Sequence, residues 1–259
     1  MIGKPIWFLV VLICHGAGAV TLSVRPKLWL LDRDGCINHD VGAPGVICQE
    51  NLLLIPGSAG AIRRLRLSAR VAIVTNQSAR GKGLLSKCEL EAIHQRMRHL
   101  IATTARGGLA SQDGKQWDAI YVCEDAGPSA TKKPAPGMVL AALADFGCDP
   151  DEAVMFGDSW SDVVAAQRAG CHSVMLGTGH GASLGACLRR QAGSLPATLT
   201  AEALAESDGT PASALGDWVA QRSASETELM KEALRRADVR VYENLAQAAD
   251  ELIAKANEL

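Results

Sequence analysis

The chain has few aromatic residues, no excess of either charge and no cysteines in a C-x-x-C spacing. Its 26 lysines and arginines nearly balance its 28 aspartates and glutamates, so the composition gives no reason to expect a nucleic-acid-binding protein. No internal repeat or strongly biased tract is present, which argues against a repeat protein or a disordered one. With 259 residues the chain is long enough to bury one substantial core.

The eight cysteines are scattered through apolar segments and form no Cys/His cluster with the spacing of a zinc site. We therefore expect reduced and mostly buried thiols. An even count also permits a disulfide framework, although a chain of this length does not need one.

Residues 5–24 contain no charged side chain. Lys4 precedes the apolar run 6–14, and Ala17-Gly18-Ala19 follows it in an A-x-A arrangement, as in a secretory signal. The other interpretation is a buried strand or helix of the domain itself. We favour a targeting or anchor segment at 1–24 and a domain at 25–259. This predicts the secretory pathway or an organelle, with membrane contact only if the segment is retained, and otherwise a cytoplasmic protein.

Short apolar runs alternate with helical patterns along the rest of the chain. Such alternation predicts an α/β fold with a parallel sheet and crossover helices. The expected strands are 27–31, 70–78, 119–122, 153–156, 172–176 and 237–244, and the expected helices are 57–67, 86–105, 138–146, a short one ending at 169, and 245–256. A glycine-rich basic loop is expected at 79–83, and residues 182–236 form an insertion with no assigned role.

Polar side chains follow several of these strands at the point where each strand ends. They are Asp32 and Asp34, Thr75 and Asn76, and Asp158, with Lys132 and Lys133 on the connection before the fourth strand. The carboxyl ends of parallel strands lie along one edge of a sheet. Three carboxylates there repel one another unless a cation joins them, and Mg²⁺ suits carboxylate oxygens and leaves room for phosphate. This set suggests phosphoryl transfer with a carboxylate nucleophile.

Four stretches resemble the motifs of the haloacid dehalogenase-like phosphatases. They are Asp32-Arg-Asp34-Gly, Thr75-Asn-Gln-Ser, Lys133-Pro, and Gly157-Asp158-x-x-x-Asp162. The closer resemblance is to the subgroup of D-glycero-D-manno-heptose 1,7-bisphosphate phosphatase and histidinol-phosphate phosphatase, and the wording of the motifs favours the heptose enzyme. The resemblance covers about 27–181 and 237–254. It implies a Rossmann-like three-layer α/β sandwich with a central parallel sheet.

The resemblance also implies a role for each motif residue. Asp32 is the nucleophile that becomes aspartyl phosphate, and Asp34 is the general acid and then the base. The backbone carbonyl of Asp34 binds Mg²⁺ together with the carboxylates of Asp32 and Asp158. Thr75 and the backbone of Asn76 hold phosphoryl oxygens.

The remaining implied roles fall to basic residues and one further acid. Lys133 neutralises the phosphoryl group, with Lys132 beside it on the substrate side. Asp162 orients either Lys133 or a water molecule and does not touch the metal. Arg80 and Lys82 either meet a second phosphate of the substrate or form an exposed basic loop.

The sequence departs from the subgroup in three places. Heptose phosphatases often carry a zinc loop of three Cys and one His, whereas residues 123–131 here contain only Cys123, so we expect no zinc. The loop after Thr-Asn-Gln-Ser is about two residues short, and residues 182–236 have no counterpart. No large cap domain is visible, which implies an essentially capless, open site.

Three functions remain as alternatives. The first is an Mg²⁺-dependent phosphatase acting on a sugar bisphosphate such as heptose 1,7-bisphosphate, and the second is a histidinol-phosphate or other small phosphomonoester phosphatase. The third is a catalytically silent, membrane-tethered binding protein, which the retained acidic residues disfavour because little but chemistry requires them together. For the enzymes we expect a small phosphorylated metabolite as partner, no nucleic acid, and a monomer.

Overall fold

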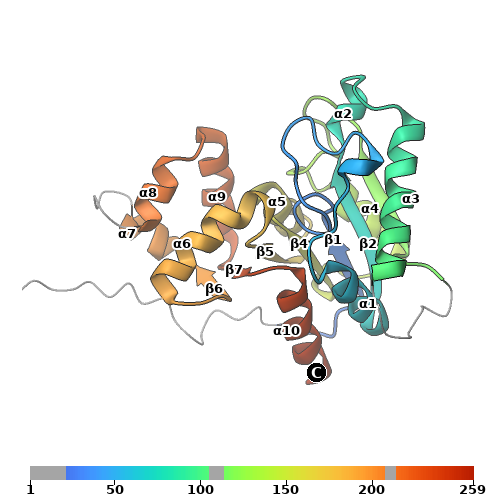
Figure 1. The fold of residues 1–259 in the computed structure, drawn as a ribbon. Helices are drawn as coiled ribbons and strands as arrows, with labels where there is room; N and C mark the ends of the chain where they lie inside the picture. Colours follow the sequence, from blue (N-terminus) through green and yellow to red (C-terminus); the bar gives the residue numbers. More distant parts are fainter. Residues whose placement is uncertain (1–21, 105–113, 208–213) are drawn as a thin grey trace, which may run out of the picture.

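The computed structural model describes residues 22–104, 114–207 and 214–259. It contains a seven-stranded sheet in the order β3-β2-β1-β4-β5-β7-β6 (Figure 1). The strands are β1 (Leu28–Leu31), β2 (Arg70–Asn76), β3 (Ala119–Cys123), β4 (Ala153–Gly157), β5 (His172–Leu176), β6 (Ala197–Leu199) and β7 (Val239–Tyr242). The expected leader lies almost entirely outside the described residues.

Helices cover both faces of the sheet, which confirms the predicted three-layer α/β sandwich. β1 is buried along its whole length, and its side chains alternate between two hydrophobic clusters. Trp29 and Leu31 face a cluster that includes α1 (Ser58–Ser68), α3 (Lys87–Thr104) and α10 (Leu245–Asn257). Leu28 and Leu30 face the opposite cluster, which includes α4 (Gly137–Phe146) and part of α5 (Trp160–Arg168).

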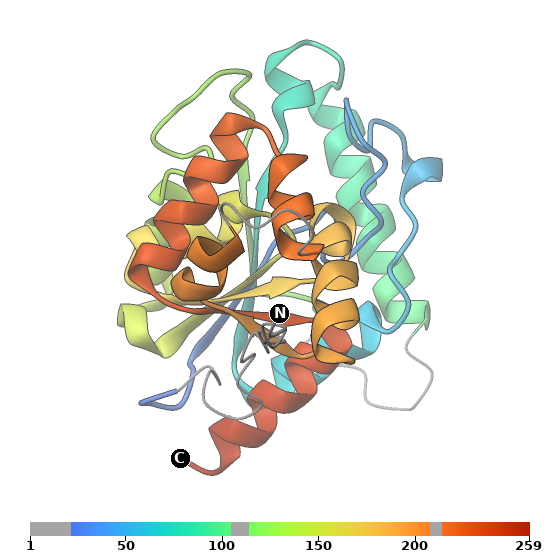
Figure 2. The same cartoon turned by 90° about the vertical axis from the view of Figure 1, so that its left-hand side faces the viewer.

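The segment 182–236 is more regular than its sequence pattern indicated. It contains α6 (Ala182–Ala192), β6, α7 (Ala201–Ser207), α8 (Ala214–Ala220) and α9 (Ala224–Arg236). These helices lie at the β6 end of the sheet and face the reader in Figure 2. They share a separate hydrophobic cluster with α5, β5 and β7.

Two sequence-based expectations need correction. The sheet is parallel except at its β6 edge, because β6 pairs with β7 in the antiparallel sense. β6 has only three residues, too few for a periodic pattern to reveal it. The expected loop at 79–83 is helical over α2 (Ser78–Gly81), where Lys82 N–H donates to the Ser78 carbonyl.

The described part of the chain contains no helix that is long and apolar enough to cross a membrane. Its seven cysteines are all free thiols, as expected, and four of them are buried.

Candidate active site

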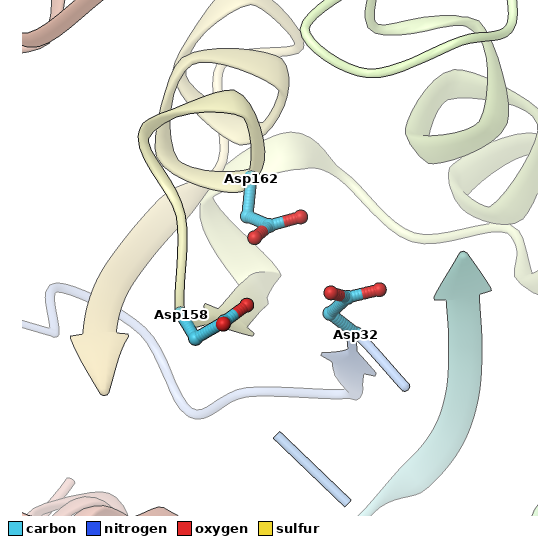
Figure 3. A group of neighbouring side chains, drawn as sticks. All are labelled: Asp32, Asp158 and Asp162. Atoms are coloured by element: carbon cyan, nitrogen blue, oxygen red, sulfur yellow. The ribbon is translucent and has the colours of Figure 1, made fainter. Parts of the chain in front are cut away.

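Three aspartates converge at the carboxyl end of the sheet (Figure 3). Asp32 directly follows β1, Asp158 directly follows β4, and Asp162 lies in the first turn of α5. One carboxylate oxygen of each lies within 4.8 Å of the others. The structure therefore brings together acids that are far apart in the sequence, by the geometry expected of parallel strands.

Lys133 is the positive partner of this cluster. Its Nζ lies 2.7 Å from Asp32 Oδ1 and 2.6 Å from Asp162 Oδ1, and it donates to the carbonyl of Val74 at 2.8 Å. The side chain is only 2% exposed. Burial lowers the pKa of Lys133, but the two carboxylates outweigh burial and raise it, so the ammonium stays charged.

Burial and mutual repulsion disfavour the ionised acids. Burial, with the neighbouring charge of Asp162, raises the pKa of Asp32 to about 7 despite Lys133. The same two causes raise the pKa of Asp158 to about 9, although the backbone N–H of His180 donates to its Oδ2 at 2.7 Å. When ionised, the three acids and Lys133 together carry two uncompensated negative charges.

This donor set fits a divalent cation. It consists of carboxylate oxygens, which are the ligands that Mg²⁺ prefers, and its excess charge matches that of the ion. Both oxygens of Asp162 already have partners. Oδ1 pairs with Lys133, and Oδ2 accepts from the backbone N–H and the hydroxyl of Ser159 at 3.1 and 2.6 Å. Asp32 and Asp158 are therefore the acids best placed to hold a metal.

Glycines pack directly against these acids. Gly35 has a φ of +80°, and a Cβ there would overlap the carboxylate of Asp158. A Cβ at Gly157 would likewise overlap Asp162. Gly35, which follows Asp34 in the first motif, thus allows the loop after β1 to lie directly against Asp158.

Asp34 lies beside the cluster and is fixed by three donors. Arg33 Nη2 donates at 2.8 Å, Asn38 Nδ2 at 2.8 Å and Gln77 Nε2 at 3.0 Å. Burial raises the pKa of Asp34, but Arg33 and the hydrogen bonds outweigh burial and lower it. The carboxylate is thus held in its ionised form.

Arg33 is completely buried behind Asp34, and its Nη1 lies 3.4 Å from His94 Nε2 on α3. Burial and the nearby charges of Arg33 and Arg98 lower the pKa of His94 to about 4, although Asp34 opposes this. His94 is therefore neutral in the folded protein over most of the pH range.

His94→Gln is expected to make the protein less sensitive to acid. A histidine with a lowered folded-state pKa stabilises the fold above the unfolded pKa of about 6.5, and that stability is lost as the pH falls. Between pH 7.5 and pH 5 the free energy of unfolding of the unaltered protein should fall by about 2 kcal/mol more than that of His94→Gln. Urea unfolding at both pH values measures this, and equal losses would contradict it.

A cavity of about 360 Å³ lies above the acids. Thr75, Asn76, Lys82 and Lys133 line it together with Asp32, Asp34, Asp158 and Asp162. The Asn76 side chain makes two hydrogen bonds of 3.0 Å with the backbone of Lys133, so it positions the lysine loop. Thr75 Oγ1 accepts from Gln77 Nε2 at 2.9 Å.

The structure does not bring two of the expected residues into this cavity. Arg80 donates to the carbonyl of Leu85 at 2.9 Å and pairs with Glu124 at 3.1 Å. Lys132 Nζ donates to the carbonyls of Asp125 and Ala126 at 3.1 and 2.9 Å. Neither side chain lines the cavity.

Other cavity residues were missed at the sequence level. His180, which follows β5, lines the cavity and has its Nε2 3.3 Å from Asp40 Oδ2 in the long loop after β1. Ser159 and Ser161 line it as well. The only signal for His180 was the Gly-Thr-Gly-His run at the end of a predicted strand.

Comparisons of this chain with a family model, with curated proteins and with solved structures all find phosphatases or hydrolases of one superfamily. A family model described as "HAD-hyrolase-like" matches residues 130–206. The D-glycero-D-manno-heptose-1,7-bisphosphate 7-phosphatase of Thermosynechococcus vestitus is 35% identical over 170 residues, which cover 61% of this chain and 81% of that protein. The D-glycero-beta-D-manno-heptose-1,7-bisphosphate 7-phosphatase of Bordetella bronchiseptica is 36% identical over 159 residues, which cover 60% of this chain and 83% of that protein.

The fold has a solved counterpart. The crystal structure of D,D-heptose 1,7-bisphosphate phosphatase from B. bronchiseptica, complexed with magnesium and phosphate, superposes with a TM-score of 0.60 and 29% sequence identity. The match covers 88% of this chain and 99% of that one. The chain is a phosphatase that belongs to the haloacid dehalogenase-like superfamily, in the subgroup that includes the heptose 1,7-bisphosphate phosphatases.

Proposed function

We propose that this phosphatase removes one phosphate from a sugar bisphosphate, and that its substrate is D-glycero-D-manno-heptose 1,7-bisphosphate, cleaved at C7. The observation that carries the proposal is the buried cluster of Asp32, Asp158 and Lys133 at the base of an open cavity. The named relatives support the substrate, since they are heptose bisphosphate phosphatases.

Asp32 is the proposed nucleophile. Its carboxylate oxygen attacks phosphorus, the bond to the sugar oxygen breaks, and the departing oxygen takes a proton from Asp34. The ionised Asp34 then removes a proton from water, which attacks the aspartyl phosphate and releases inorganic phosphate with Asp32 restored. Asp34 must carry a proton for the first step, and the charge of an incoming phosphate favours this because it raises the pKa of a nearby carboxyl.

Lys133 and the end of β2 stabilise the transferring group. The ammonium of Lys133 lies 2.7 Å from the attacking carboxylate, where it can offset charge that develops on the phosphoryl oxygens. Thr75 and the backbone of Asn76 are proposed to donate to the same oxygens. Mg²⁺, held by Asp32, Asp158 and the Asp34 carbonyl, would polarise the phosphoryl group and offset the repulsion between the acids. Asp162 acts as a positioning residue for Lys133.

The second phosphate of the substrate requires a cation at the rim of the cavity. Lys82 lines the cavity and is exposed, whereas Arg80 and Lys132 are held by Glu124 and by backbone carbonyls. We therefore assign the second phosphate to Lys82 rather than to Arg80 or Lys132.

The loop at 123–131 is proposed to be held without zinc. Thr131 Oγ1 donates to Cys123 Sγ at 3.4 Å, and this thiol donates to Asp125 Oδ2 at 3.5 Å. Ser129 Oγ also accepts from the backbone N–H of Lys132 at 3.1 Å. These hydrogen bonds connect the two ends of the loop. Zinc is not expected to do so, because a structural zinc needs four ligands and this loop has a single thiol.

Phosphate release with Mg²⁺ tests the proposal. The panel contains heptose 1,7-bisphosphate, other sugar bisphosphates, histidinol phosphate and simple phosphomonoesters. We expect the highest kcat/KM with the heptose bisphosphate, a selective rise in its KM in Lys82→Ala, and protein without stoichiometric zinc by emission spectrometry. A preference for histidinol phosphate, or uniform weak activity, would overturn the substrate but keep the reaction.

A further inference from the structure

A second cavity of about 310 Å³ opens beside the first. Four residues line both cavities: Asp158, Ser159, Ser161 and His180. The second cavity is therefore next to the place where the reacting phosphate would bind. The far wall of the second cavity is built by the segment 182–236, from α6, α8 and α9. A segment without an assigned role therefore forms one side of a compartment next to the reacting phosphate.

This wall is fixed in place by contacts with the catalytic layer. Arg168 on α5 makes a two-point ion pair with Glu232 on α9, with N–O distances of 2.9 and 2.7 Å. Trp218 Nε1 on α8 donates to Ser183 Oγ on α6 at 2.9 Å. Because α5 begins just after Asp158, these contacts hold the wall at a set distance from the acids.

The lining combines aromatic and aliphatic side chains with polar ones. Trp160, Met175, Leu184, Trp218 and Leu229 supply the apolar surface. The guanidinium of Arg222 lies over the Trp218 ring, 4.9 Å from its centroid, and its Nη1 is 3.5 Å from Glu226 Oε1. Arg222 is the only lysine or arginine among the described residues of this lining, and Glu226 offsets its charge, so the compartment does not favour a second phosphate. It favours an uncharged ring with an apolar face.

We propose that this compartment binds the alcohol part of the substrate, and that it takes phosphomonoesters whose leaving alcohol carries such a ring. This proposal rests on the proposed function, because the ring reaches the second cavity only when the phosphate of the same ester is bound at Asp32. The segment 182–236 thereby extends the range of substrates beyond a free sugar bisphosphate.

Two esters and three variants test the compartment. 2-Naphthyl phosphate carries a flat ring, whereas glycerol 2-phosphate fits within the first cavity. Ser225→Trp and Leu229→Trp fill the second cavity from α9, and Glu228→Trp places the same side chain on an exposed position of that helix outside the lining. Both filling variants should lower the ratio of kcat/KM for the naphthyl ester to that for the glycerol ester about tenfold or more, through KM. Glu228→Trp should leave the ratio unchanged.

Calorimetric titration with 2-naphthol gives a readout that does not need catalysis. The unaltered protein should bind 2-naphthol, and Ser225→Trp should bind it at least about tenfold more weakly. Hydrolysis of both esters with an unchanged ratio in the filling variants, or no binding of 2-naphthol, would overturn the compartment. Binding of 2-naphthol without hydrolysis of the naphthyl ester, while heptose 1,7-bisphosphate is hydrolysed, would overturn the proposed substrates. Binding of 2-naphthol without hydrolysis of either ester or of heptose 1,7-bisphosphate would instead overturn the proposed reaction and keep the cavity as a ring-binding site.

Discussion

Asp32→Asn is expected to reduce phosphate release by about four orders of magnitude or more. Asparagine has nearly the same shape, but its neutral amide is a poor nucleophile and cannot form the aspartyl phosphate. The fold should survive, because Lys133 keeps its ion pair with Asp162 at 2.6 Å. The measurement is initial-rate phosphate release at saturating Mg²⁺, with thermal unfolding to show that the variant is folded.

Asp151→Asn is the matched control, since Asp151 is exposed and does not line the cavity. It should retain full activity. Substantial turnover by a folded Asp32→Asn protein would mean that another group attacks phosphorus. Rapid quench of the unaltered enzyme should in turn trap phosphate on Asp32, and phosphate found on another residue would also contradict the assignment.

Removal of Mg²⁺ with a chelator is expected to abolish activity reversibly and to lower the melting temperature. Burial and the neighbouring carboxylate of Asp162 raise the pKa of both Asp32 and Asp158, and a bound cation offsets the cost of ionising these buried acids. At a concentration of about one hundred times its Kd, Mg²⁺ should stabilise the fold by about 2.7 kcal/mol. For a chain of this length that corresponds to a rise of about 5–10 °C.

Two variants separate the proposed ligands from the positioning acid. Asp158→Asn should lose most of the Mg²⁺-induced rise in melting temperature together with activity. Asp162→Asn should retain the rise, because the oxygens of Asp162 are already engaged by Lys133 and Ser159, while its kcat falls as Lys133 loses its orientation. If Asp162→Asn lost the Mg²⁺-induced rise in melting temperature and Asp158→Asn kept it, Asp162 would be the metal ligand and Asp158 the positioning acid.

The acids of the site were predictable because a general rule of parallel sheets applies to them. Asp32 and Asp158 each follow a strand of near-continuous apolar residues, and the carboxyl ends of neighbouring parallel strands share an edge. The position of Lys132 and Lys133 before the fourth strand made both of them candidates. Only the resemblance selected Lys133, since nothing in the local pattern shows which of the two side chains reaches Asp32.

The directions of the basic side chains were not predictable from the sequence. Arg80 and Lys82 lie two residues apart in the same short stretch, yet one pairs with Glu124 and the other lines the cavity. Long cationic side chains on loops and short helices follow whichever acceptors the tertiary fold brings near, and those acceptors come from distant segments. The same holds for Trp218, whose position at the second cavity depends on how α8 packs against α6.

The position of β7 has a consequence for how the chain folds during synthesis. β7 lies between β5 and β6, but it is made only after the whole segment 177–238. Until then the hydrogen-bonding edge of β5 is unpaired, and such edges promote association between chains. Closing the sheet also requires contacts between residues far apart in sequence, which slows folding. The nascent chain is thus expected to depend on a chaperone or on rapid packing of α6 against β5 before β7 emerges from the ribosome.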